Sequence, residues 1–237
     1  MKKENLEQNQ VEEVLQMSGV SRRHFLALSG GLAVAGIFAT MSSCKKDKDP
    51  QVMPDGTIDL GSGDIGILNY AYALEQLEAA FYTRVAESSF SSGFSASEQA
   101  LLTDIRDHEI AHREFFKAAL AGNAIPALEV NFDAIDFGSR TSVLNAARTF
   151  EDLGVQAYNG AGQLITTGDY LVLAGKIVSV EARHAAYIRD LITPNSFGSA
   201  DIIDSNGMDM HKMPSEVLAA AAGFLKSKIS GNNLPTS

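Results

Sequence analysis

Two stretches of the chain place a glutamate three residues before a histidine. The first holds Glu109 and His112, and the second holds Glu181 and His184. Residues three apart in a helix lie on one face about a turn from each other, so both side chains of a pair can approach one cation. A carboxylate that can bridge two ions, together with an imidazole, suits Fe, Mn or Zn. One such pair arises easily by chance, but two pairs on alternate predicted helices indicate a shared metal site.

Two further glutamates are each followed seven residues later by a tyrosine. Glu75 precedes Tyr82, and Glu151 precedes Tyr158. Seven residues make about two helical turns, so each glutamate shares a helix face with its tyrosine. The order Glu/Tyr then Glu/His therefore occurs twice, which predicts a duplicated helical hairpin whose copies meet about a pseudo-twofold axis. Two metal ions fit that symmetry, with one terminal glutamate from each Glu/Tyr helix, two bridging glutamates and two histidines.

The four glutamates lie among apolar residues on faces that should point into the protein. Burying an unpaired charge is costly, so each carboxylate needs a cation, a proton or a basic partner. A buried ion network is the alternative to a metal site, and its bases would come from four arginines: Arg84, Arg106, Arg148 and Arg183. Four carboxylates with two imidazoles form a ligand set rather than a charge-balanced one, which favours the metal.

Several neighbouring side chains have more than one interpretation. Glu78 lies one turn beyond Glu75 on the same face and is an alternative or additional ligand, although the spacing to Tyr82 favours Glu75. Tyr82 and Tyr158 are either hydrogen-bond donors to the ligands or packed core residues. His108 points about 100° away from the glutamate that follows it, which indicates a surface position or a contact behind the ligands.

Helical periodicity dominates from about residue 64, and no stretch shows convincing strand alternation. We expect four long helices and a C-terminal one, over about 64–87, 95–120, 140–166, 168–193 and 214–229. Ser95 followed by Glu98 predicts a capping box at the second helix, and Gly122 is expected to end that helix. The connections between the long helices are short, long and short. The sequence thus predicts an all-α four-helix bundle with one long crossover between helices two and three, plus a C-terminal helix.

The ligand pattern resembles that of the ferritin-like di-iron carboxylate superfamily, which includes rubrerythrin, bacterioferritin and ferritin. The stretches 68–82 and 154–161 are most similar to the exported ferritin-like domain family that includes plant desiccation-related proteins. The resemblance covers about residues 64–193. It implies a ferritin-like bundle with two iron ions, Mn or a mixed Fe/Mn pair being the alternatives. The residues that match the ligand pattern are Glu75, Glu109, His112, Glu151, Glu181 and His184.

The first residues resemble an export signal rather than part of the fold. Residues 21–26 resemble a twin-arginine motif, and the apolar run 26–39 is shorter than the roughly 20 residues that span a bilayer. Cys44 ends a stretch that resembles a lipoprotein processing box, which predicts lipidation and a periplasmic or cell-envelope location. An uncleaved N-terminal anchor is the alternative. The expected division is an export signal, a tether, the bundle and a C-terminal loop with a helix, over 1–43, 44–63, 64–193 and 194–237.

The formal net charge is −10, and the export signal contributes none of it because its acidic and basic residues are equal in number. A domain this acidic is a poor nucleic-acid binder.

We expect metal ions and O2 or peroxide as partners and the membrane only through the lipid anchor, and a homodimer is compatible with the sequence. Two functions stay open: a redox enzyme with ferroxidase or O2/peroxide-reducing activity, or a non-catalytic stress-related or metal-sequestering protein with structural metals.

Overall fold

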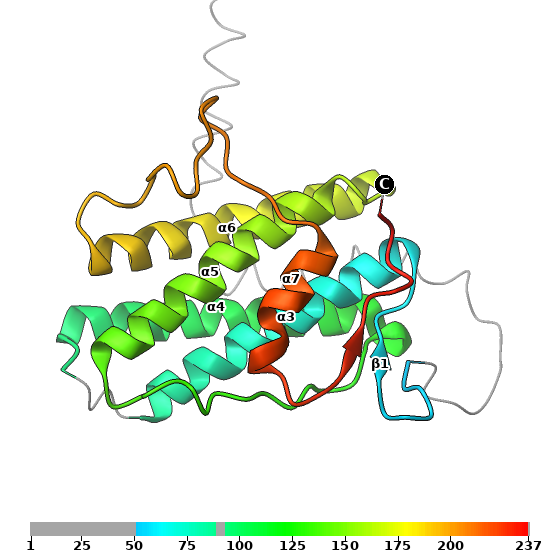
Figure 1. Ribbon diagram of the computed structural model, residues 1–237, viewed down its shortest axis with the longest axis horizontal. Coiled ribbons are helices and arrows are strands. Elements are labelled where there is room, and N and C mark those ends of the chain that lie inside the picture. The colour runs from blue at the N-terminus through cyan, green and yellow to red at the C-terminus, as the bar shows by residue number, and fades with distance from the viewer. Residues whose placement is uncertain (1–50, 89–92, 237) are drawn as a thin grey trace, which may run out of the picture. The chain divides into compact units, whose positions relative to one another are not determined.

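The computed structural model describes residues 51–88 and 93–236. Its body is made of four long helices, which are α3 (Gly63–Glu87), α4 (Ala96–Leu120), α5 (Arg140–Gly162) and α6 (Gly168–Ile192). Helix α3 packs mainly on α4, and α5 packs mainly on α6. The chain between α4 and α5 runs along the bundle from one end to the other (Figure 1), so the predicted all-α bundle with one crossover is confirmed. The twin-arginine motif, the apolar run and Cys44 lie outside the described residues.

The N-terminal end of α4 has its predicted cap, whereas the C-terminal end differs in one detail from its prediction. Ser95 is the N-cap and forms the predicted capping box with Glu98, in which each side chain accepts from the other residue's backbone N–H. At the other end Ala121 takes a positive φ of 48°, and Gly122 lies in the short 3-10 helix η2 (Ala121–Asn123) that follows. Helix α4 therefore ends at Leu120 as predicted, but the positive φ that follows it falls on Ala121 and not on Gly122.

Helix α5 ends at Gly162 and not near residue 166 as expected. The backbone N–H groups of Thr166 and Thr167 donate to the carboxylate of Asp64, at distances of 2.9 and 2.8 Å. These N–H groups are thus bonded to the first turn of α3 instead of extending α5, so α5 ends four residues earlier than its sequence pattern predicts, while α6 begins at Gly168 as expected.

The C-terminal segment also differs from its prediction. It consists of α7 (Pro214–Ala221), the 3-10 helix η3 (Ala222–Phe224) and β2 (Ile229–Ser230), which pairs in parallel with β1 (Ile58–Asp59). The prediction of a single helix to residue 229 is therefore wrong, and the two-residue strands β1 and β2 are too short to give a strand pattern in the sequence. Gly223 weakens the helix, and the backbone beyond it bonds to the crossover, because Asn131 N donates to Phe224 O and Lys226 N donates to Glu129 O.

Helix α3 lies at the centre of the fold, while α4 and α6 are half exposed. Seventeen of the 25 residues of α3 are buried, compared with five of α4 and six of α6. Helix α7 packs on α5, and the chain beyond it pairs with the crossover at Val130 and with β1. The part of the expected tether that the structure describes also packs on the domain, since Ile58 and Leu60 belong to the core. Among the described helices, none is both long and apolar enough to cross a bilayer.

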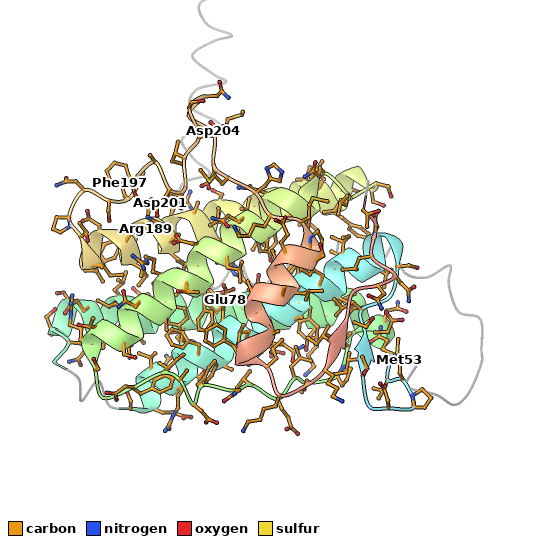
Figure 2. All side chains as sticks on the ribbon, in the orientation of Figure 1. Met53, Glu78, Arg189, Phe197, Asp201 and Asp204 are labelled. Carbon is orange, nitrogen blue, oxygen red and sulfur yellow. The ribbon has the colours of Figure 1, made fainter. Side chains whose placement is uncertain are left out.

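A buried arginine on α6 binds the segment that follows this helix and also binds α5. Arg189 is 6% exposed, and its guanidinium donates at 2.7 Å to each carboxylate oxygen of Asp152 on α5. It also donates to Ser199 and to both carboxylate oxygens of Asp201. Figure 2 shows Arg189 and Asp201 beside α6 and the loop beyond it. Each of the three guanidinium nitrogens thus has an acceptor within the protein.

Candidate metal centre

The six residues of the predicted ligand set converge inside the bundle. Each of the four long helices contributes one glutamate, and all four glutamates are 0% exposed. The side chains form two groups whose potential ligand atoms lie within 4.8 Å of one another. One group is Glu75, Glu109, His112 and Glu181, and the other is Glu109, Glu151, Glu181 and His184. Glu109 and Glu181 therefore belong to both groups.

The distances within the two groups follow the predicted pseudo-twofold symmetry. His112 Nδ1 lies 2.8 Å from Glu181 Oε1, 3.4 Å from Glu75 Oε2 and 3.6 Å from Glu109 Oε2. His184 Nδ1 lies 2.8 Å from Glu109 Oε1, 3.5 Å from Glu151 Oε2 and 3.7 Å from Glu181 Oε2. Each imidazole thus lies nearest to the glutamate of the other Glu-x-x-His pair, and each points the same nitrogen at three carboxylates.

The two tyrosines orient the glutamates from behind, and they do so across the bundle. Tyr82 on α3 donates to Glu151 Oε1 on α5, and Tyr158 on α5 donates to Glu75 Oε1 on α3. All four side chains are buried. Both tyrosines are hydrogen-bond donors to the predicted ligands, but each serves the glutamate of the opposite repeat. The other oxygen of each glutamate, Oε2, is left facing a histidine.

Most of the unpartnered buried polar atoms of the described residues lie in this cluster. Ten buried side-chain oxygens and nitrogens lack hydrogen-bond geometry to any partner, and eight of them belong to the six residues. They are Glu75 Oε2, both oxygens of Glu109, His112 Nδ1, Glu151 Oε2, both oxygens of Glu181 and His184 Nδ1. A buried polar atom without a partner costs free energy. All eight can give a lone pair to a cation, so the donor set fits two metal ions.

Without a metal, protons must balance the cluster. Burial and the negative charge of Glu181 raise the pKa of Glu109 to about 8, although the contacts with His112 and His184 lower it. Burial opposes a charge on His112, but Glu109, Glu181 and Glu75 outweigh it and raise its pKa to about 12. Burial also opposes the charge on Glu181, yet His112 and His184 outweigh it and lower the pKa of this carboxyl to about 2. The metal-free site therefore holds protons where a cation would carry the positive charge.

The arginines of the alternative ion network do not take part. Arg84 pairs with Glu87, Arg106 pairs with Asp107, and Arg183 is exposed. Within residues 51–88 and 93–236, the only basic side chains within 4.0 Å of the four glutamates are the two histidines. Two imidazoles cannot neutralise four carboxylates, so the structure contradicts the ion network.

Glu78, the alternative ligand, is buried but belongs to neither group. It lies in the middle of the bundle (Figure 2) and against Gly154, where an added Cβ would be 2.9 Å from Glu78 Oε1. Burial, followed by the charges of Glu181 and its neighbours in the cluster, raises the pKa of Glu78 well above the usual value of a glutamate. No pattern in the sequence indicated that Gly154 makes room for it.

His108 lies in contact with a predicted ligand. Its Nδ1 is 2.9 Å from Nε2 of His184, on the side of the ring that faces away from the glutamates. The sequence pattern left a surface position and such a contact both open. The structure shows both, because His108 is exposed on α4 and its ring still reaches His184 on α6.

A comparison with known protein families bears on the whole four-helix region. The family model of the ferritin-like domain matches residues 63–194, which is more than half of the chain. A comparison with curated proteins returns no match. The matched region begins with α3, ends just after α6 and contains all six residues of the cluster. From its fold, its buried carboxylate and histidine groups and this match, we conclude that the chain belongs to the ferritin-like domain family.

Proposed function

We propose that this protein holds two iron ions in the cluster and reduces O2 or peroxide with them, as a ferroxidase or an oxidant scavenger. The observation that carries the proposal is the set of eight unpartnered, buried donor atoms on six residues. Glu109 and Glu181 would be shared by both ions, because they belong to both groups. Glu75 with His112 would complete one position, and Glu151 with His184 the other. Manganese in one or both positions is compatible with the same donors.

Iron supplies the one-electron redox chemistry that oxygen or peroxide reduction requires and that amino-acid side chains lack. The protein supplies orientation, water exclusion and proton storage. Tyr82 and Tyr158 fix one oxygen of each terminal glutamate. The four cluster glutamates are fully buried, whereas the side chain of His112 is 15% exposed. Glu109, whose pKa is raised to about 8, would release its proton when a cation enters.

Anaerobic loading of the full chain with Fe(II), followed by exposure to O2, tests this function. We expect two irons per chain by elemental analysis and faster O2 consumption than an equal concentration of free Fe(II). The double variant Glu109→Gln/Glu181→Gln is the control and should do neither, because both shared carboxylates are lost. Binding of two irons that raises the melting temperature without O2 consumption would instead favour the non-catalytic alternative, in which the metals brace a stress-related or metal-sequestering protein. Binding of no iron would reject both.

The proposed location is the periplasm or cell envelope, as expected from the resemblance to the exported ferritin-like domain family that includes plant desiccation-related proteins. Its support is the sequence alone, through the twin-arginine motif and Cys44. Fractionation of cells that express the full chain tests it. Arg22→Lys/Arg23→Lys should keep the protein in the cytoplasm, and Cys44→Ala should release it from the membrane fraction. A cytoplasmic wild-type protein would contradict the proposal.

A further inference from the structure

The pseudo-twofold symmetry of the cluster does not extend to the residues that lie behind its two histidines. His108 and Val180 occupy equivalent places, each one residue before the shared glutamate of its helix. His108 Nδ1 lies 2.9 Å from His184 Nε2, whereas the described residues offer His112 no hydrogen bond to its own Nε2. A valine side chain cannot accept one. One histidine of the cluster is therefore held from behind, and the other is not.

The geometry of the two rings is that of an imidazole–imidazole hydrogen bond. The ring planes are within 10° of parallel and the centroids are 5.2 Å apart. Because the centroid separation is much longer than the N–N distance, the rings meet edge to edge, which keeps the bond in the plane of both. His184 directs Nδ1 at the carboxylates, 2.8 Å from Glu109 Oε1. When that nitrogen gives its lone pair to a cation, the hydrogen must sit on Nε2, which donates to His108.

We propose that His108 is a positioning residue that makes the two metal positions unequal, so that the one built from Glu109, Glu151, Glu181 and His184 binds more tightly and fills first. The inference rests on the proposed metal binding. A hydrogen bond from behind fixes the orientation and tautomer of a ligating histidine and makes it a better donor, and its loss typically costs about 10- to 100-fold in metal affinity. His112 lacks this support.

The difference in exposure between the two histidines supports the same order of filling. The side chain of His184 is 6% exposed, and that of His112 is 15% exposed. A position that water reaches exchanges its ion more readily than an enclosed one. The half of the cluster that holds His112 is therefore both less oriented and more open.

Titration of the metal-free full chain with Co(II), followed by visible absorption and calorimetry, tests the inference. Wild type should bind two ions per chain in two steps, the first about 10- to 100-fold tighter than the second. Glu151→Gln should remove the tight step and leave the weak one, which assigns the tight step to the His184 position. His108→Ala should weaken the first step by about 10- to 100-fold, so that the two steps merge while two ions still bind.

Two further variants separate positioning from a general structural effect. His108→Asn should restore the tight step, because its side-chain oxygen can accept the bond from His184 Nε2. Val180→Ala, the matched change on α6, should leave both steps as in wild type. Equal steps in wild type, unchanged binding in His108→Ala, or no rescue by His108→Asn would each overturn the role of His108 while the two-metal site stands. A wild-type chain that binds no Co(II) would overturn the metal site itself.

Discussion

Among residues 51–88 and 93–236, buried charge lies in two places, and the two are built differently. Around Arg189, one guanidinium donates to two carboxylates and a hydroxyl, so every charge has an internal partner. In the cluster mid-bundle, four carboxylates face two imidazoles, and eight of their atoms lack a hydrogen bond. Arg189 and Glu181 both lie on α6, two turns apart.

This difference separates a structural ion network from a cluster that could hold cations. A buried charge with a complete set of partners contributes to one folded geometry and needs nothing from solution. Buried carboxylate oxygens and imidazole nitrogens whose lone pairs meet no hydrogen-bond donor are stable only with a bound cation or with bound protons. At Arg189 the protein itself supplies the positive charge that faces the carboxylates. At the four cluster glutamates the positive charge must come from solution, as a cation or as protons.

Removal of a shared carboxylate should have the largest effect. Glu181→Gln removes an oxygen donor from both groups, so we expect the loss of both metal ions, measured by elemental analysis after anaerobic loading and desalting. Glu78→Gln is the matched control, since Glu78 is as deeply buried on α3 but belongs to neither group. It should retain two ions. Retention of two ions by Glu181→Gln would remove the distinction between the cluster and an ordinary acidic core.

Removal of Arg189 should destabilise the fold without changing metal binding. Arg189→Leu leaves Asp152 without its partner, and breaking a buried pair costs about 3–5 kcal/mol. We expect about 2–4 kcal/mol because the side chain of Asp201, the second acceptor, is 64% exposed and solvent screens it. Urea unfolding measures the loss, and exposed Arg183→Leu should cost less than about 0.5 kcal/mol. A changed number of bound ions in Arg189→Leu would show that the two regions are coupled.

The two regions should respond to pH with opposite signs. The pKa of Glu109 is about 8 in the folded protein against 4.5 in the unfolded chain, so the folded state holds the extra proton between these values. The metal-free protein should therefore lose stability as pH rises from about 5 to 8. Arg189 lowers the pKa of Asp201 from 3.8, so that contribution is present above pH 3.8 and is lost as pH falls below it.

Urea unfolding with a chelator at several pH values checks both signs. Glu109→Gln should flatten the fall between pH 5 and 8, and Asp201→Asn should reduce the loss in acid. The stabilisation by added Co(II) should grow from pH 6 to 8, because fewer protons then compete for the ligands. Stability of the metal-free protein that rises over this range would contradict the assigned protonation of the cluster.

The tyrosine variants should have the smallest effects, and they compare the two halves of the cluster directly. Tyr82→Phe and Tyr158→Phe each leave one glutamate oxygen without its donor, at a cost of about 1–2 kcal/mol in the metal-free protein. Thermal unfolding should give similar values for both, since the two bonds are equivalent. A clear difference would show that the asymmetry at His108 extends to the terminal glutamates.

The residues that converge in the centre were predictable because helical periodicity is local. Spacings of three and seven place Glu109 with His112, and Glu75 with Tyr82, on common faces whatever the rest of the chain does. Apolar neighbours then indicate that these faces point inward. The four long helices, the capping box at Ser95 and the crossover are confirmed for the same reason, since caps, breaks and loop lengths are properties of short segments.

The contacts between elements were not predictable in this way. Tyr82 reaches the glutamate of the opposite repeat, Arg189 binds Asp152, and the chain beyond α7 joins the crossover and β1 instead of continuing as a helix. Each depends on which backbones lie side by side, and the packing of the whole core sets this.

The sequence by itself determined a bundle of four amphipathic helices with a carboxylate-rich ligand set on the inward faces. Only the tertiary structure decided which atoms of that set lack partners, which tyrosine serves which glutamate, and that His108 supports one histidine of two. The physical reason is the range over which each feature is determined, which is local along a helix but long-range between two helices. Spacing along a helix fixes the direction of a side chain, but a hydrogen bond of about 2.9 Å also requires a fixed distance between two helices.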